Sequence, residues 1–334
     1  MKILFIGGSG NISSACTRAA LEKGYTVYHL NRGKTTFEVI PGVTMLTADI
    51  HVPGQTEKAI AGLKFDVVAN FIGFTAADVQ RDIDLFAGKT GQYIYISSAS
   101  AYQKPLAYPF VTESTPLKNP YWDYSRDKIA AEETLLQAYR DIDFPVTIIR
   151  PSLTYQYVIP LAIGGWDDYG IIDRMRKGLP VIVHGDGSSL WTITHSEDFA
   201  KGFAGLLGHQ QAIGQAFHIT SDEVLTWNQI YEAVAAAIGV KANIIHISSD
   251  FICDAAEALG QGWMRGSLLG DKSCSVIFDN SKIKSFVPGY SALIPFSEGI
   301  KRTIAWFETD PRRMIINEDN NKFIDSIIRS YKNR

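Results

Sequence analysis

Short strand-like runs alternate with longer amphipathic segments through the first 150 residues of the chain. The runs are rich in β-branched and aromatic residues and span residues 2–6, 26–30, 43–46, 66–71, 93–97 and 146–149. Parallel neighbours in a sheet need a crossover, usually a helix, and runs that are apolar on both faces suit strands covered on both sides. The alternation therefore predicts an α/β fold with a doubly wound, mostly parallel sheet.

The second half of the chain lacks this regular alternation. Helix-period stretches return after Arg150-Pro151, at residues 196–207, 227–238, 297–308 and 320–331. The sequence holds no internal repeat and no low-complexity linker, so a second lobe should pack directly on the first. We expect residues 1–158 with roughly 189–218 to form a nucleotide-binding domain, and roughly 159–188 with 219–334 to form a smaller mixed α/β substrate-binding lobe. The cleft between them is the expected active site.

A glycine-rich loop follows the first strand and precedes a helical run over residues 14–23. It reads Gly7-Gly8-Ser9-Gly10-Asn11-Ile12-Ser13. Glycines permit a tight turn and let backbone N–H groups approach a pyrophosphate at the positive end of the following helix. The loop predicts a dinucleotide cofactor bound by Gly7, Gly10, Asn11 and Ile12. The alternative is an ordinary glycine turn.

The end of the second strand bears on the choice between NAD and NADP. An acid at this place binds the 2'-hydroxyl of the adenosine ribose, whereas an arginine can accept a 2'-phosphate. Asn31 and Arg32 stand there, Lys34 follows, and residues 30–34 contain no acid. NADP is therefore favoured over NAD. The alternative, that Arg32 and Lys34 belong to a solvated loop, stays open.

Three more residues are assigned to the cofactor site. Asp49 and Ile50 follow the third strand, where an aspartate can meet the adenine amino group and an isoleucine the face of the ring. Phe71 ends the fourth strand. The carboxyl ends of parallel strands are where open α/β sheets bind their ligands.

Tyr124 and Lys128 are four residues apart, hence on one face of a helix that runs to about Tyr139. An ammonium beside the ring and the positive charge of a nicotinamide favour tyrosinate, so we expect the pKa of Tyr124 to fall towards the working range. Tyr124 would then move a proton to or from the substrate.

Serine hydroxyls end the fifth strand, just before this helix. Ser97, Ser98 and Ser100 all stand where a hydroxyl can hydrogen-bond a substrate carbonyl or a developing alkoxide. The alternative is that they only complete backbone hydrogen bonds of the strand end.

Together these motifs resemble the extended short-chain dehydrogenase/reductases, and within them the NAD-dependent epimerase/dehydratase proteins. The likeness runs from the glycine loop to the helix near Trp306. It implies a Rossmann-type fold in which Ser98 is the catalytic serine, Tyr124 the acid/base and Lys128 the residue that binds the nicotinamide ribose. It also suggests a homodimer formed through the helix that carries Tyr124.

The chain departs from the pattern of this family at several positions. Ser13 replaces the usual third glycine of the loop, and Ala99-Ser100 replaces the Asp-Glu pair of 4,6-dehydratases, which disfavours dehydration. The asparagine and arginine that hold the substrate diphosphate in UDP-sugar epimerases are also missing from residues 150–155 and 186–192, because the first stretch has no amide and the second no arginine. Ser100, Tyr155 and Trp191 are the candidate substrate contacts.

Composition limits the classes of partner. A formal charge of -3 over 334 residues creates no field that would collect nucleic acid or an anionic membrane, so a small-molecule substrate is expected. Lys2 and four apolar residues before the glycines are too short for a signal peptide, which makes the cytoplasm the default location. The three cysteines have no metal or disulfide spacing, so no metal is expected.

The leading hypothesis is an NAD(P)-dependent oxidoreductase or epimerase that acts at a hydroxyl or keto carbon of a sugar nucleotide or another small carbonyl compound. The alternative is a cofactor-binding regulatory or RNA-associated protein on the same fold without turnover. Retention of Ser98, Tyr124 and Lys128 favours the enzyme.

Overall fold

A seven-stranded parallel sheet forms the centre of the first lobe. The structure is a computed structural model that describes residues 1–33, 40–164 and 166–333. The strand order across the sheet is β12-β7-β5-β4-β1-β2-β3, and every neighbouring pair is parallel. Its strands are β1 (Lys2–Ile6), β2 (Thr26–Asn31), β3 (Val43–Thr47), β4 (Phe65–Asn70), β5 (Thr90–Ile96), β7 (Val146–Pro151) and β12 (Ala216–Ile219). The predicted Rossmann-type sheet is confirmed, and β12 adds a seventh strand to the six predicted runs.

Helices cover both faces of this sheet. Along β1, Ile3 and Phe5 face one side, where they pack with α1 (Ser13–Glu22) and α6 (Ser196–Leu206). Leu4 and Ile6 face the other side, with α3 (Ala76–Phe86) and α4 (Asp123–Ile142). Successive side chains of a strand point to opposite faces, so an apolar run becomes a strand with two buried faces. The short helix α2 (Gln55–Ala59) lies between β3 and β4 in the chain.

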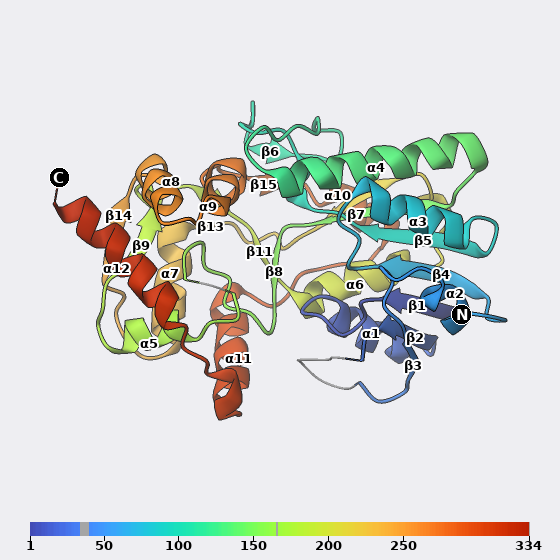
Figure 1. The fold of residues 1–334 in the computed structure, drawn as a ribbon, viewed down its shortest axis with the longest axis horizontal. Helices are drawn as coiled ribbons and strands as arrows, with labels where there is room; N and C mark the ends of the chain where they lie inside the picture. The colour runs from blue at the N-terminus through green and yellow to red at the C-terminus, as the bar shows by residue number, and fades with distance from the viewer. Residues whose placement is uncertain (34–39, 165, 334) are drawn as a thin grey trace.

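The second lobe is built mainly from the last third of the chain and lies to the left in Figure 1. Its helices are α5 (Gly170–Arg176), α7 (Trp227–Ala237), α8 (Ser249–Ala258), α9 (Trp263–Ser267), α11 (Phe296–Glu308) and α12 (Glu318–Lys332). Helix α10 (Ser281–Phe286) packs instead against the sheet layer through Ile283. Single helical turns occur at Ala99–Ala101, Gln210–Ala212, Leu268–Lys272 and Pro311–Arg313.

Four short two-stranded ladders connect the lobes or brace the second one. They are β8 (Leu153–Tyr155) with β11 (Ile193–His195), β9 (Val181–His184) with β14 (Ile244–Ile247), β10 (Leu190–Trp191) with β13 (Leu225–Thr226), and β15 (Ile277–Phe278) with β6 (Phe110–Val111). The β10–β13 pair is antiparallel and the other three are parallel.

The four helices predicted in the second half correspond to α6, α7, α11 and α12, each with ends within two residues of the predicted ones. The sequence pattern did not reveal α8. The proposed division into a domain of residues 1–158 with 189–218 and a lobe of 159–188 with 219–334 stays a prediction. No helix in the described parts of the chain combines the length and apolar character needed to cross a membrane.

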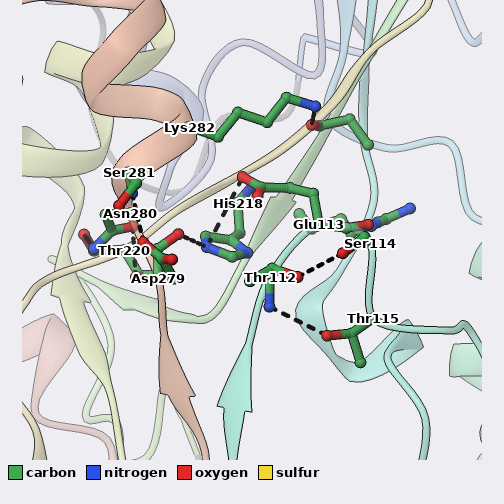
Figure 2. A network of polar contacts seen from close by, with 12 residues as sticks. Thr112, Glu113, Ser114, Thr115, His218, Thr220, Asp279, Asn280, Ser281 and Lys282 are labelled. Atoms are coloured by element: carbon green, nitrogen blue, oxygen red, sulfur yellow. Dashed lines mark hydrogen bonds and ion pairs between the residues drawn. The ribbon is translucent and has the colours of Figure 1, made fainter.

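A buried polar network fastens the second lobe to the edge strand β12 (Figure 2). The Nε2 atom of His218 contacts the carbonyl oxygen of Asp279 at 2.7 Å, so it carries the proton, and Nδ1 accepts from the hydroxyl of Tyr102 at 3.1 Å. The backbone N–H of His218 donates to Glu113 at 3.2 Å. Burial lowers the pKa of His218, against the opposing effects of Glu113 and the Asp279 carbonyl. The network holds the end of β15, and with it Phe278, in place.

Candidate active site

A cavity of about 510 Å³ lies at the carboxyl ends of the sheet strands, closed on one side by the second lobe. Residues of the glycine loop, of the ends of β4, β5 and β7, and of the second lobe all contribute to its wall. The lining includes Gly7, Gly10, Asn11, Ile12, Ser13, Phe71, Ser97, Ser98, Ser100, Lys104, Trp122, Tyr124, Trp166, Trp191, Trp263, Ser267, Asp271, Lys272 and Phe278. This edge of a doubly wound sheet is where such folds bind ligands.

The side chain of Ser13 closes the glycine loop. Gly7 has a φ of +77°, which favours glycine. The hydroxyl of Ser13 donates to the carbonyl oxygen of Gly7 at 2.7 Å and accepts from the backbone N–H of Gly10 at 2.8 Å. Ser13, the departure from the family pattern, therefore fixes the turn through its hydroxyl. Helix α1 starts on the cavity wall without a side-chain cap, so the positive end of its dipole is open to an anion.

Asn11 anchors this loop to the chain beyond β8. Its side-chain nitrogen donates to the carbonyl oxygen of Thr154 at 2.9 Å, and its oxygen accepts the backbone N–H groups of Gln156 and Tyr157, both at 2.9 Å. Asn11 lies on the cavity wall as predicted, but its side chain is committed to these bonds. Only its backbone remains for a cofactor.

Five predicted cofactor residues do not line this cavity: Lys128, described below, and Asn31, Arg32, Asp49 and Ile50. Asn31 ends β2, and its side-chain oxygen is buried without a partner among the described residues. Arg32 is exposed, and Lys34 lies outside the described residues. The carboxylate of Asp49 accepts the backbone N–H of His51 at 3.0 Å, and Ile50 is buried. Asn31 and Arg32 lie at the end of β2, and Asp49 and Ile50 come after β3. Both strands lie on the same side of β1 in the sheet, where the adenosine end of a dinucleotide would extend.

Tyr124 is the second residue of α4 and lies on the cavity wall. Its ring packs against Trp122 at 4.9 Å and Phe74 at 6.3 Å between centroids. Burial raises its pKa to about 12, a hydrogen bond to Ser98 acts to lower that pKa, and Asp271 acts to raise it. In the protein alone, desolvation of the phenolate therefore outweighs the contacts that lower the Tyr124 pKa, and the predicted fall, which also depends on the charge of a nicotinamide, stays a prediction.

Lys128 lies behind Tyr124 rather than on the cavity wall. Its Nζ donates to the carbonyl oxygens of Gly73 at 2.7 Å and Ile96 at 2.8 Å, and is 5.8 Å from the centroid of the Tyr124 ring. Burial lowers the pKa of Lys128 to about 7, against the opposing effect of Glu132. An ammonium has three N–H donors, so one remains for a ligand.

The strand-end hydroxyls form a chain that leads to Tyr124. The hydroxyls of Ser98 and Ser100 are 2.9 Å apart, and Ser125 donates to Ser100 at 2.8 Å. Ser98 also accepts the backbone N–H of Ser100, at 3.2 Å. The hydroxyl of Ser97 is buried without a partner among the described residues. Ser125 was not predicted as a site residue, because a single serine next to a tyrosine does not indicate a site.

The second lobe supplies an aromatic and charged wall that sequence reasoning found only in part. Trp191 lines the cavity as predicted. Tyr155 does not, because its ring is fully buried against His195 and Phe296, with centroids 5.3 Å away in both cases. Its assignment as a substrate contact is corrected to a core position. Lys104 and Lys272 line the cavity and were not predicted, because isolated loop lysines are usually solvated.

Two curated relatives match most of the chain. The 2'-dehydrokanamycin reductase of Streptomyces kanamyceticus is 26% identical over 77% of this chain and 72% of its own length. The chloroplast stem-loop binding protein of 41 kDa b from Arabidopsis thaliana is 28% identical over 73% of this chain and 65% of its own length.

Solved structures share the fold at low sequence identity. An epimerase from Methanothermobacter thermautotrophicus superposes with a TM-score of 0.74 at 16% identity, covering 94% of each chain. The UDP-glucuronic acid 4-epimerase of Bacillus cereus, solved with UDP-glucuronic acid and NAD, gives a TM-score of 0.71 at 18% identity, covering 92% of this chain and 99% of the other. The model of the NAD dependent epimerase/dehydratase family matches residues 3–220. With the glycine loop, the strand-end serines and the Tyr124–Lys128 helix already in place, the chain belongs to the NAD dependent epimerase/dehydratase family.

Proposed function

We propose that this protein is an NADP-preferring oxidoreductase that interconverts a hydroxyl and a keto group on a small molecule, with Ser98, Tyr124 and Lys128 as its catalytic set. The observation that carries the proposal is the shared cavity wall: Ser98 and Tyr124 meet there between the glycine loop and the second lobe. A carbonyl placed at this point would reach both hydroxyls. Ser97, whose buried hydroxyl has no partner among the described residues, is a further donor to the same space.

The fit of a dinucleotide rests on the glycine loop and on the start of α1, which both line the cavity. The uncapped start of α1 and the backbone of Gly7, Gly10 and Ile12 would hold the pyrophosphate. Phe71 lines the same cavity, and the third N–H of Lys128 would hold the nicotinamide ribose. Bound in this way, a nicotinamide would supply or accept the hydride.

Tyr124 would act mainly as a proton donor. With a pKa of about 12 in the protein alone, the phenol is protonated at neutral pH and can give its proton to a carbonyl oxygen. The hydroxyl of Ser98 donates a hydrogen bond to the same oxygen as negative charge develops on it. A partly charged Lys128, with a pKa of about 7, holds the ring from behind.

We favour net reduction over epimerisation or dehydration. Ala99 and Ser100 stand where dehydratases carry their acid pair, and neither hydroxyl nor methyl can replace a carboxylate as general base. Curated relatives include reductases of 2'-dehydrokanamycin and of 2-alkyl-3-oxoalkanoates. The relative described as a stem-loop binding protein keeps an RNA-associated function as the second candidate.

The test is turnover by the purified full chain. The protein is incubated with NADPH or NADH and a panel of ketones, oxo acids and sugar nucleotides, following nicotinamide absorbance and product stereochemistry. A sustained loss of absorbance supports a reductase, and an inverted sugar without net absorbance change would show an epimerase instead. Absence of turnover together with salt-sensitive RNA binding would favour the second candidate.

The preference for NADP is tested at Arg32. Replacing Arg32 with alanine is expected to raise KM for NADPH by about tenfold or more and to leave KM for NADH nearly unchanged, because only the former carries a 2'-phosphate. Arg140→Ala, at an exposed position in the last turn of α4, is the control for loss of one surface arginine. An equal effect of Arg32→Ala on both cofactors would contradict the assignment.

A further inference from the structure

Lys104 places an ammonium on the cavity wall without a hydrogen-bond or ion-pair partner among the described residues. The residue is 3% exposed, and it makes no side-chain hydrogen bond or ion pair within the described part of the chain. Its neighbour is the ring of Trp191, whose centroid is 5.8 Å from Nζ. Burying an unpaired charge costs several kcal/mol, so buried charges are almost always paired. An unpaired cation that faces a cavity indicates that its partner enters with a ligand.

Lys272 adds a second cation to the same wall. It is 4% exposed, and its Nζ donates to the hydroxyl of Ser267 at 3.0 Å and lies 3.6 Å from the carboxylate of Asp271. Burial lowers the pKa of Lys272, and the Lys104 ammonium acts in the same direction, so the two charges lie close enough to repel each other. Among the described residues that line the cavity, these two lysines face a single carboxylate, Asp271.

The two lysines come from segments other than the glycine loop, which we propose holds the cofactor. Lys104 lies in the segment that leaves β5, beyond Ser98, and Lys272 ends the helical turn Leu268–Lys272 of the second lobe. The glycine loop follows β1, which β4 separates from β5 in the sheet. Trp122 and Trp191 also lie on the wall, and Lys272 is 5.6 Å from the ring centroid of Trp122. The cations therefore stand next to flat aromatic surfaces.

We propose that Lys104 and Lys272 form an anion-binding subsite, and that the substrate of this protein is a hydroxyl or keto compound that carries a carboxylate or phosphate group. That the bound anion is a substrate rests on the proposed function. The subsite itself is a binding property that can be measured without turnover. In this subsite, the charges of Lys104 and Lys272 take the place of the diphosphate contacts that the chain lacks at residues 150–155 and 186–192. A polycationic compound would be repelled from this wall.

The experiment measures anion binding by the full chain saturated with NADP, so that the cofactor phosphates fill their own site. Inorganic phosphate, pyrophosphate, an oxo carboxylic acid and its methyl ester are titrated separately, with tryptophan fluorescence as the signal because four tryptophans line the cavity. Tighter binding of the acid than of its ester shows recognition of a carboxylate. Tighter binding of phosphate or pyrophosphate than of the acid shows recognition of a phosphate. Either result supports the subsite.

Lys104→Met is the informative variant, because it removes the charge and leaves no protein group unpaired. Loss of a charge-assisted hydrogen bond should weaken anion binding by about tenfold or more, and Lys104→Arg should retain most of the affinity. Lys118→Met, at an exposed position of the same inter-strand segment, is the matched control and should bind as the original protein does. A thermal melt of each variant checks that it is folded.

Three outcomes would overturn the subsite: no anion binding by the unaltered protein, equal affinity in Lys104→Met and Lys118→Met, or equal binding of acid, ester and phosphate. One of these outcomes could occur while Lys104→Met and the unaltered protein turn over uncharged ketones with the same kcat/KM. That combination would reject the subsite and support the oxidoreductase. Anion binding that Lys104→Met abolishes, without turnover of any compound, would support the subsite and reject the oxidoreductase.

Discussion

Replacing Tyr124 with phenylalanine is expected to lower kcat by about 10²–10⁴-fold on whichever carbonyl substrate the protein turns over. The change removes the phenolic oxygen and keeps the ring, so the contacts with Trp122 and Phe74 survive. The substrate oxygen then lacks its proton donor and keeps only hydrogen bonds from the strand-end serines. Cofactor affinity should be nearly unchanged, because the glycine loop and Lys128 are untouched.

The matched control for this variant is Tyr121→Phe, an exposed tyrosine just before the same helix. It should have the kcat of the unaltered protein. Steady-state kinetics with the reduced cofactor give kcat, and direct titration of the cofactor gives its affinity. A Tyr124→Phe protein with kcat equal to that of Tyr121→Phe would remove Tyr124 from the mechanism.

Replacing Glu132 with glutamine is expected to lower the free energy of unfolding by about 3–5 kcal/mol. Glu132 is fully buried on α4 and holds Arg150 of β7 in a two-point contact, with Nε–Oε1 at 2.9 Å and Nη2–Oε2 at 2.6 Å. Arg150 is 4% exposed and stacks on the ring of Tyr102 at 4.9 Å. Glutamine keeps the shape and removes the charge, so the guanidinium is left buried without an anion.

Glu133→Gln is the control, because the neighbouring carboxylate on α4 is exposed and should contribute under about 1 kcal/mol. Chemical denaturation of both variants gives the two free energies. Equal stabilities of Glu132→Gln and Glu133→Gln would mean that the buried pair does not hold α4 on the sheet. Since α4 also carries Tyr124, a loosened Glu132→Gln protein should lose activity before it unfolds.

The sheet of the first lobe could be read from the sequence because its signals are local. Runs apolar on both faces, such as 2–6 and 93–97, have no stable place except as strands between two helical layers, and the glycine loop marks the turn after the first of them. The spacing of Tyr124 and Lys128 likewise placed both on one side of α4. The helix α8 was missed because short apolar stretches in a mixed lobe do not distinguish helix from loop.

The sequence by itself determined the sheet, the glycine loop after its first strand and the placing of Tyr124 and Lys128 on one helix, because these depend on periodicity and short spacings. Only the tertiary structure decided what surrounds each side chain. It buried Tyr155 against His195, raised the pKa of Tyr124 in the protein alone, and brought Lys104 and Lys272 to one wall. Burial, desolvation and the pairing of charges depend on neighbours from distant parts of the chain, which local patterns do not encode.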